Sequence, residues 1–103
     1  MIDWNRVQEL RDEIGAEDFA EIAVLFLSEI EEAAEGLPTI TDPTARSEAL
    51  HGMKGSAMNL GFQAFANICK EGEVNPGSVD FGGLTDTLGQ SVAALKSKFP
   101  ELA

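Results

Sequence analysis

The sequence predicts an all-α fold, an antiparallel up-and-down four-helix bundle with an additional short N-terminal helix. Apolar residues recur every three or four positions along five segments, which is the spacing of one face of an α-helix. No segment sustains the alternation of apolar and polar residues that is typical of a strand, and the chain contains no tyrosine. Four longer amphipathic helices with short connections bury their apolar faces most simply as an antiparallel bundle.

The first two predicted helices are separated by a single glycine. Asp3 is a suitable N-cap for a short helix over Trp4–Ile14, and Gly15 suits the position just after its end. We expect this short helix to cover one end of the core. The second helix, over Ala16–Gly36, repeats its apolar residues every three or four positions along its whole length.

Proline and glycine delimit the three remaining helices. Asp42 and Pro43 supply an N-cap and a first-turn proline for a third helix, which is expected to run to about Leu60. A fourth helix over residues 62–73 and a fifth over residues 81–99 follow. Each glycine within the fifth helix costs up to about 1 kcal/mol of helix propensity, so packing must stabilise that segment.

Length and charge exclude several classes of function. The 103 residues fit one domain with one core, residues 1–103. The formal net charge is −11, with no cluster of lysine and arginine to neutralise phosphates, so we expect no nucleic-acid partner. The longest apolar run is far shorter than the roughly 20 residues that cross a bilayer, so no membrane insertion is expected.

Location and oligomeric state are predicted from weaker signals. No export signal is visible at the N-terminus. One cysteine, Cys69, cannot form an intramolecular disulfide, which favours the reducing cytoplasm. No feature of the sequence requires dimerisation, and we expect a monomer.

The stretch HGMKGSAMNLG, residues 51–61, contains the only histidine of the chain. At about 100° per residue, His51 falls on the flank of the third helix, between the apolar stripe and solvent. Lys54 and Gly55 follow at i+3 and i+4 and share that surface. Gly52 and Gly55 are unfavourable inside a helix, and their missing side chains leave clearance beside the imidazole for a bulky group or another protein's backbone.

Several interpretations of His51 compete. The simplest is a helix-surface histidine without chemistry. Glu48 and His51 have the Glu-x-x-His spacing of di-iron helix bundles, but those sites need a second such pair and the chain has one histidine. A Ser-His-Asp hydrolase would need a nucleophile elbow or oxyanion site that the sequence does not supply. The remaining chemistry is nucleophilic: a neutral imidazole accepts a phosphoryl group, whose charge Lys54 is placed to offset.

These residues resemble the histidine-containing phosphotransfer (HPt) domain of multistep two-component phosphorelays. The resemblance covers nearly the whole chain, and its most specific part is a histidine followed by x-x-Lys-Gly-Ser and then Asn-Leu-Gly. It implies that His51 is the phosphoryl acceptor, that Lys54 neighbours the phosphoryl group, and that Gly55 opens space beside the ring.

Members of this family are phosphoryl carriers rather than independent catalysts. The resemblance implies that His51 accepts a phosphoryl group from a receiver-domain phosphoaspartate and passes it to another receiver aspartate. The expected partners are response-regulator receiver domains and a hybrid sensor histidine kinase. Mg²⁺ is expected on the receiver, and no cofactor or metal on this chain. Because the sequence has no P-loop and no ATP-binding glycine motif, we expect no kinase activity.

Docking of a receiver requires a surface around His51. The second helix has more apolar residues than one core stripe can use, because its apolar face is widened by Ile22, Val24, Leu25 and Leu27. Met58 shares the flank of His51. We hypothesise that some of the second-helix residues, Ile22 and Leu25 among them, form an exposed apolar patch with Met58 beside the histidine; in the alternative, the N-terminal helix covers those of the second helix. The alternative function is a helical-bundle adaptor that binds signalling partners without phosphorylation.

Overall fold

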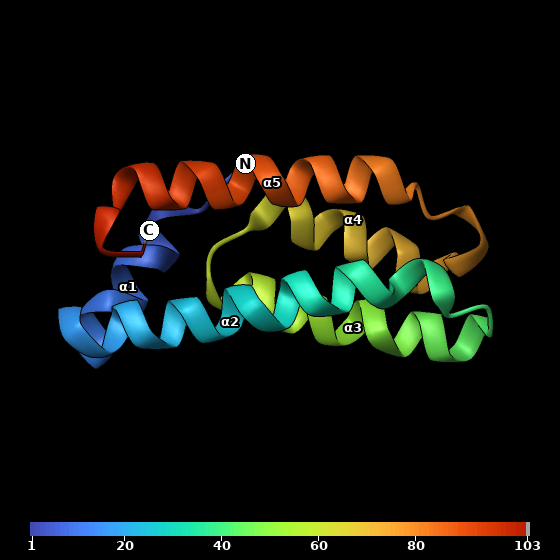
Figure 1. Ribbon diagram of the computed structural model, residues 1–103, viewed down its shortest axis with the longest axis horizontal. Coiled ribbons are helices and arrows are strands. Elements are labelled where there is room, and N and C mark those ends of the chain that lie inside the picture. Colours follow the sequence, from blue (N-terminus) through green and yellow to red (C-terminus); the bar gives the residue numbers. More distant parts are fainter. Residues whose placement is uncertain (103) are drawn as a thin grey trace.

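The computed structural model describes residues 1–102 and is all-α (Figure 1). Its five α-helices are α1 (Trp4–Ile14), α2 (Ala16–Gly36), α3 (Pro43–Asn59), α4 (Gln63–Val74) and α5 (Phe81–Lys98). Three short 3₁₀ helices are η1 (Leu37–Thr39), η2 (Pro76–Ser78) and η3 (Pro100–Leu102), and no strand occurs within residues 1–102. The predicted all-α class is confirmed, and every α-helix begins and ends within one residue of its predicted boundary.

The three 3₁₀ helices were not predicted. Each contains a proline in its first or second position. The fixed φ of proline suits the first turn of a helix, whereas its missing N–H and its ring prevent a long α-helix from continuing through it. These turns therefore form where α2, α4 and α5 end.

Three aspartates begin helices through side-chain caps. Asp3, Asp42 and Asp80 each accept a hydrogen bond from a backbone N–H three residues ahead, at 3.2, 2.9 and 3.1 Å. Each carboxylate satisfies one of the N–H groups that the first turn of a helix leaves without a partner. The caps predicted at Asp3 and Asp42 are therefore present.

Gly61 connects α3 to α4 and also receives the N-terminal segment. Its φ is +72°, a conformation that side chains disfavour. The Asp3 N–H donates to the Gly61 carbonyl at 2.7 Å, and a Cβ on Gly61 would lie 2.5 Å from the Asp3 carbonyl oxygen. Glycine is required here by both the turn and the close approach.

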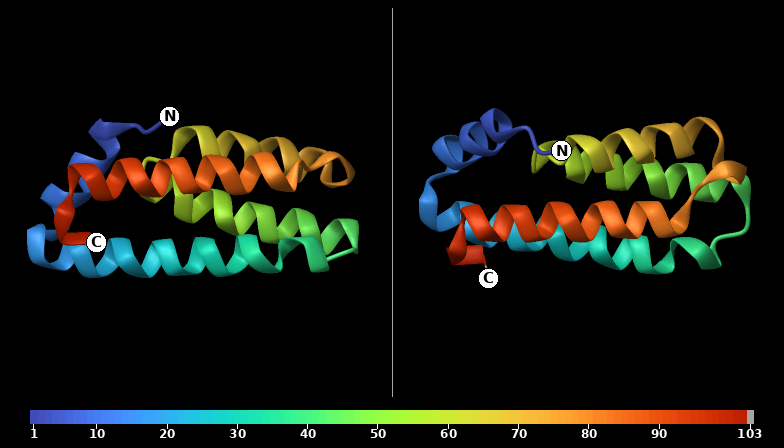
Figure 2. Two further views of the ribbon diagram at one scale, coloured as in Figure 1. Left: turned by 45° about the horizontal axis from the view of Figure 1, so that its top comes forward. Right: turned by 90° about the horizontal axis from the view of Figure 1, so that it is seen from above.

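The helices α2 to α5 run along the long axis of a molecule that measures 39 × 20 × 20 Å (Figure 1). Both α2 and α4 pack against α3 and α5, while α1 packs against α2 at the end where α2 begins (Figure 2). The core lies between these helices and contains three fully buried phenylalanines, Phe19, Phe62 and Phe65. From α1, Val7 and Leu10 are buried, so α1 contributes to the core at this end.

The orientation of α3 determines where the histidine lies. Leu50, Met53 and Ala57 are buried and form the core-facing stripe that the helical spacing predicts. His51 is next to Leu50 in sequence, so it projects about 100° away from that stripe. Within residues 1–102, no helix has the length and apolar character needed to span a membrane.

Candidate functional site

His51 lies outside the core on α3. Its neighbour Leu50 is fully buried, whereas 73% of the His51 side chain is exposed. This position agrees with the one predicted from helical geometry. Because most of the imidazole surface is accessible, a large partner is able to reach the ring.

Glu73 on α4 lies beside His51 and was not identified from the sequence. One carboxylate oxygen, Oε1, lies 3.1 Å from His51 Nδ1 and 2.8 Å from Lys54 Nζ. Glu73 is in the last turn of α4, where a negative charge is unfavourable to the helix dipole. Other carboxylates in the chain, such as Glu71, have the same unfavourable position, so it does not single out Glu73; its partners depend on the packing of α4 against α3.

The contact with Glu73 selects one form of the neutral imidazole. An ionised carboxylate only accepts hydrogen bonds, so His51 Nδ1 donates the proton in this pair. The other ring nitrogen, Nε2, then carries the lone pair. In its neutral form, His51 thus combines an oriented ring with a lone pair on Nε2, which is the form of a nucleophilic imidazole.

Lys54 and Glu73 form a partly shielded ion pair. Their side chains are 21% and 18% exposed. The hydrogen bond from Lys54 is the main cause that lowers the pKa of Glu73 from its ordinary value of 4.5, and the nearby charges of Lys54 and His51 act in the same direction. Partial burial opposes them. Glu73 is therefore ionised at neutral pH, and Lys54 has a carboxylate partner that the sequence did not reveal.

The glycines beside His51 face open space. A Cβ built on Gly52 or on Gly55 would have no neighbouring atom within 4 Å. The internal packing of the protein therefore does not require glycine at either position. Because glycine has no side chain, these two positions leave the solvent side of α3 open beside His51.

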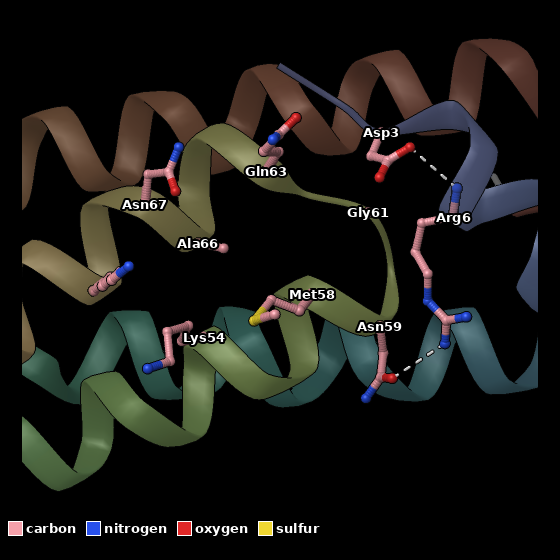
Figure 3. Close-up of a pocket in the computed structure, with 10 residues that line it drawn as sticks. Asp3, Arg6, Lys54, Met58, Asn59, Gly61, Gln63, Ala66 and Asn67 are labelled. Carbon is pink, nitrogen blue, oxygen red and sulfur yellow. Dashed lines mark hydrogen bonds between the residues drawn. The ribbon is translucent and has the colours of Figure 1, made fainter.

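The predicted docking residues line two separate hollows. Met58, 58% exposed, and Lys54 line one hollow of about 590 Å³. Figure 3 shows these two side chains on α3 opposite Ala66 and Asn67 of α4. Ile22 and Leu25 line the other hollow, of about 540 Å³. Met58 thus shares a hollow with Lys54, whereas Ile22 and Leu25 line a hollow that contains neither residue.

Within α2, the apolar residues of the second hollow differ in exposure. Leu25 is 56% exposed and Val24 is 45% exposed, while Ile22 is half-buried and Leu27 is buried in the core, so Leu27 is not part of an exposed patch. Two large apolar side chains of α2 are therefore accessible from solvent and are not covered by α1. An exposed pair of this kind is a candidate contact for a partner.

The other groups of chemical interest are potential metal ligands and the Cys69 thiol. Within residues 1–102, no group of three or more His, Cys, Asp or Glu side chains is placed to hold a metal ion. Cys69 is buried, and this burial, with a smaller effect of the Glu73 charge, raises the pKa of its thiol to about 12. The thiol therefore stays protonated and unreactive at neutral pH.

No protein-family model, curated protein or solved structure matches the chain. The arrangement of His51, Lys54 and Glu73 is therefore the basis for assigning a function.

Proposed function

We propose that this protein is a phosphorelay intermediate, which accepts a phosphoryl group on His51 from a receiver-domain phosphoaspartate and passes it to another receiver aspartate. The observation that carries the proposal is the exposed imidazole whose Nδ1 is bound to Glu73 Oε1 at 3.1 Å. In the neutral imidazole, that contact favours the tautomer whose lone pair is on Nε2, as a phosphoryl acceptor requires. The resemblance of residues 51–61 to the HPt family supports the same chemistry.

In the proposed reaction, the lone pair of His51 Nε2 attacks the phosphorus of the receiver's aspartyl phosphate. An N–P bond forms as the bond between phosphorus and the aspartate oxygen breaks, and the aspartate leaves as a carboxylate. The ring keeps its proton on Nδ1 and becomes cationic, and the Glu73 carboxylate stabilises this charge. The reverse sequence returns the phosphoryl group to a second receiver, so the chain requires no ATP and no cofactor of its own.

Lys54 and the two glycines complete this proposal. The Lys54 ammonium, on the turn that follows His51, offsets the negative charge of the phosphoryl oxygens. Gly52 and Gly55 leave room for the receiver to approach the ring. Met58, Ile22 and Leu25 are proposed as apolar contacts for the receiver. Mg²⁺ is expected in the receiver's own site.

The proposal includes the detailed topology, an antiparallel up-and-down four-helix bundle formed by α2 to α5 with α1 as the additional helix. It is supported by the short connections between successive helices and by the contacts of α2 with α3, α3 with α4, α4 with α5 and α5 with α2. We further propose a monomer that acts in the cytoplasm with receiver domains and a hybrid sensor kinase.

A direct test is to mix the protein and Mg²⁺ with a panel of receiver domains that carry a radiolabelled phosphoryl group. We expect label on the protein that is stable in alkali and labile in acid, as a phosphohistidine is. The variant His51→Gln should stay unlabelled, and because His51 is exposed the fold should be retained. The absence of label on the wild type, or undiminished label on His51→Gln, would refute the proposal.

The adaptor function is distinguished in the same experiment. An adaptor would bind a receiver with equal affinity whether or not His51 is present, and the wild type would acquire no label. The exposed Val24 and Leu25 are the observation that favours this second function, because a docking surface serves either role.

A further inference from the structure

The backbone of Glu73 is held by α3 as well as by its own helix. Glu73 is the second-last residue of α4, so its carbonyl has no partner within the helix. The Ser47 hydroxyl on α3 donates to this carbonyl at 2.9 Å. Ser47 is four residues before His51, one turn earlier on the same side of α3. The hydrogen bond therefore joins the backbone of Glu73 to the helix that carries the histidine.

The backbone of α4 comes close to α3 at Gly72, directly before Glu73. A Cβ on Gly72 would lie 2.8 Å from Leu50 Cδ1 and 3.1 Å from Val79 Cγ2. Gly72 thus allows the last turn of α4 to come nearer to α3 than a larger residue would permit. Because Gly72 and Leu50 directly precede Glu73 and His51, this approach sets the separation of the two helices at the site.

The segment that follows Glu73 is also bound to α3. Arg46 donates from its guanidinium to the carbonyl of Pro76 at 3.0 Å and to the carbonyl of Ile40 at 2.9 Å. The same guanidinium lies over the Phe81 ring, 5.1 Å from its centre. Arg46 holds the chain after α4, whereas Ser47 forms a hydrogen bond with the backbone of Glu73 itself.

From these contacts we propose that Ser47 is a positioning residue, which holds Glu73 so that its carboxylate keeps the proton of His51 on Nδ1. A hydrogen bond at 3.1 Å tolerates little displacement before it weakens. When the Ser47 hydroxyl is removed, the Glu73 backbone loses its link to α3 and the tautomer preference of His51 declines. The importance of this effect for transfer rests on the proposed function, but the tautomer itself is measurable without any phosphoryl group.

The test uses the full chain and two variants of matched shape, Ser47→Thr, which keeps a hydroxyl, and Ser47→Val, which lacks one. Ring-nitrogen NMR at a pH where His51 is neutral reports the ratio of the two tautomers. We expect the Nδ1–H form to predominate in the wild type and in Ser47→Thr. In Ser47→Val the ratio should shift toward the Nε2–H form by about fivefold, the equivalent of one net hydrogen bond.

Ser91→Ala is the control for a general loss of stability. Ser91 is buried on α5 and its hydroxyl also donates to a backbone carbonyl, that of Thr87 at 2.8 Å. Its removal should lower stability without moving the His51 tautomer ratio. An unchanged ratio in Ser47→Val, or an equal shift in Ser91→Ala, would overturn the proposal.

The outcome is separable from that of the proposed function. A shifted tautomer in Ser47→Val together with an unlabelled wild type would retain the role of Ser47 and reject the phosphorelay. A labelled wild type with an unchanged tautomer ratio in Ser47→Val would support the phosphorelay and reject the role of Ser47. If the phosphorelay function and the role of Ser47 are both correct, Ser47→Val should accept label more slowly than Ser47→Thr.

Discussion

Glu73 and His51 are 22 positions apart on different helices, and Glu73 Oε1 lies 3.1 Å from His51 Nδ1. The same oxygen accepts a hydrogen bond from Lys54 at 2.8 Å. A single carboxylate therefore orients the imidazole and binds the neighbouring ammonium. Changes to any one of these three side chains should affect the other two, which is the basis of the first two predictions.

The first prediction concerns pH and stability. Lys54 lowers the pKa of Glu73 in the folded protein below its ordinary 4.5, so the ion pair stabilises the fold above that pH. This contribution should be lost as the pH falls from 4.5 through the lowered pKa. Urea unfolding from neutral pH downward should therefore show a difference in stability between the wild type and Glu73→Gln that shrinks in acid.

Lys54→Met is the matched variant for this measurement. It removes the main cause of the lowered pKa but keeps the carboxylate. As the pH is lowered, the stability of Lys54→Met should fall less steeply than that of the wild type. Glu73→Gln should behave in the same way. If all three proteins lose stability in parallel below pH 4.5, the ion pair does not contribute as described.

The second prediction concerns Lys54 in transfer. Lys54→Ala should reduce the rate of phosphoryl transfer to His51 by about tenfold, because a charge-assisted hydrogen bond to the phosphoryl group is lost. Lys54→Arg, which keeps the charge, should retain more of the rate. Lys70→Ala is the control, since Lys70 lines the same hollow and forms no ion pair within residues 1–102. Equal effects of Lys54→Ala and Lys70→Ala would contradict a specific role for Lys54.

The third prediction separates stability from access at Gly55. A Cβ at this position meets no atom within 4 Å, so Gly55→Ala should increase the free energy of unfolding by up to about 1 kcal/mol. Gly55→Gln should also be folded, but its side chain should cover the approach to His51 and slow transfer. Rates measured with one labelled receiver, beside urea unfolding, test both effects.

Gly89 on α5 provides the matched control for Gly55. A Cβ on Gly89 also meets nothing within 4 Å, and it lies on a helix that does not carry the histidine. Gly89→Ala and Gly89→Gln should change stability in the same way as the Gly55 variants and leave transfer unchanged. Transfer at the wild-type rate in Gly55→Gln would reject the access role.

The fourth prediction concerns receiver docking. Leu25→Ala and Met58→Ala should alter stability by no more than about 0.5 kcal/mol, because both side chains are mostly exposed. Each should weaken receiver binding by about fivefold or more if its hollow is covered by the partner. Titration calorimetry with a receiver, beside the exposed-surface control Gln90→Ala, measures this directly. Truncations that change stability but never binding or transfer would remove the docking hypothesis.

Because Leu25 and Met58 line separate hollows, the two variants also locate the interface. A loss of binding in Met58→Ala alone would place the receiver over the hollow that contains Lys54. A loss in Leu25→Ala alone would place it over α2. Ile22→Val, a conservative change at a half-buried position, extends the test to the third predicted docking residue.

Local signals predicted the helices well. The caps at Asp3 and Asp42 and the positive φ of Gly15 lie at the predicted positions, because capping and left-handed turns depend on a few adjacent residues. The 3₁₀ turn at Pro76 was not predicted. This segment is also held by a hydrogen bond from Arg46 on α3 to the Pro76 carbonyl.

The candidate site was predicted in part. The sequence placed His51, Lys54 and Gly55 on one side of one helix, since residues three and four apart share a helix surface. Sequence spacing within one helix contains no information about a carboxylate on another helix, so Glu73 was missed. For the same reason, the sequence does not reveal that Met58 and Leu25, on different helices, line different hollows.

The sequence by itself therefore determined the all-α class, the helix boundaries and the exposure of His51, because periodicity and capping act over a few residues. The tertiary structure decided which groups meet the imidazole. The close approach at Gly72 and the Ser47 hydrogen bond bring the last turn of α4 against α3, and so place Glu73 between His51 and Lys54. These contacts join residues far apart in the chain, and only the packing of two helices determines their distance.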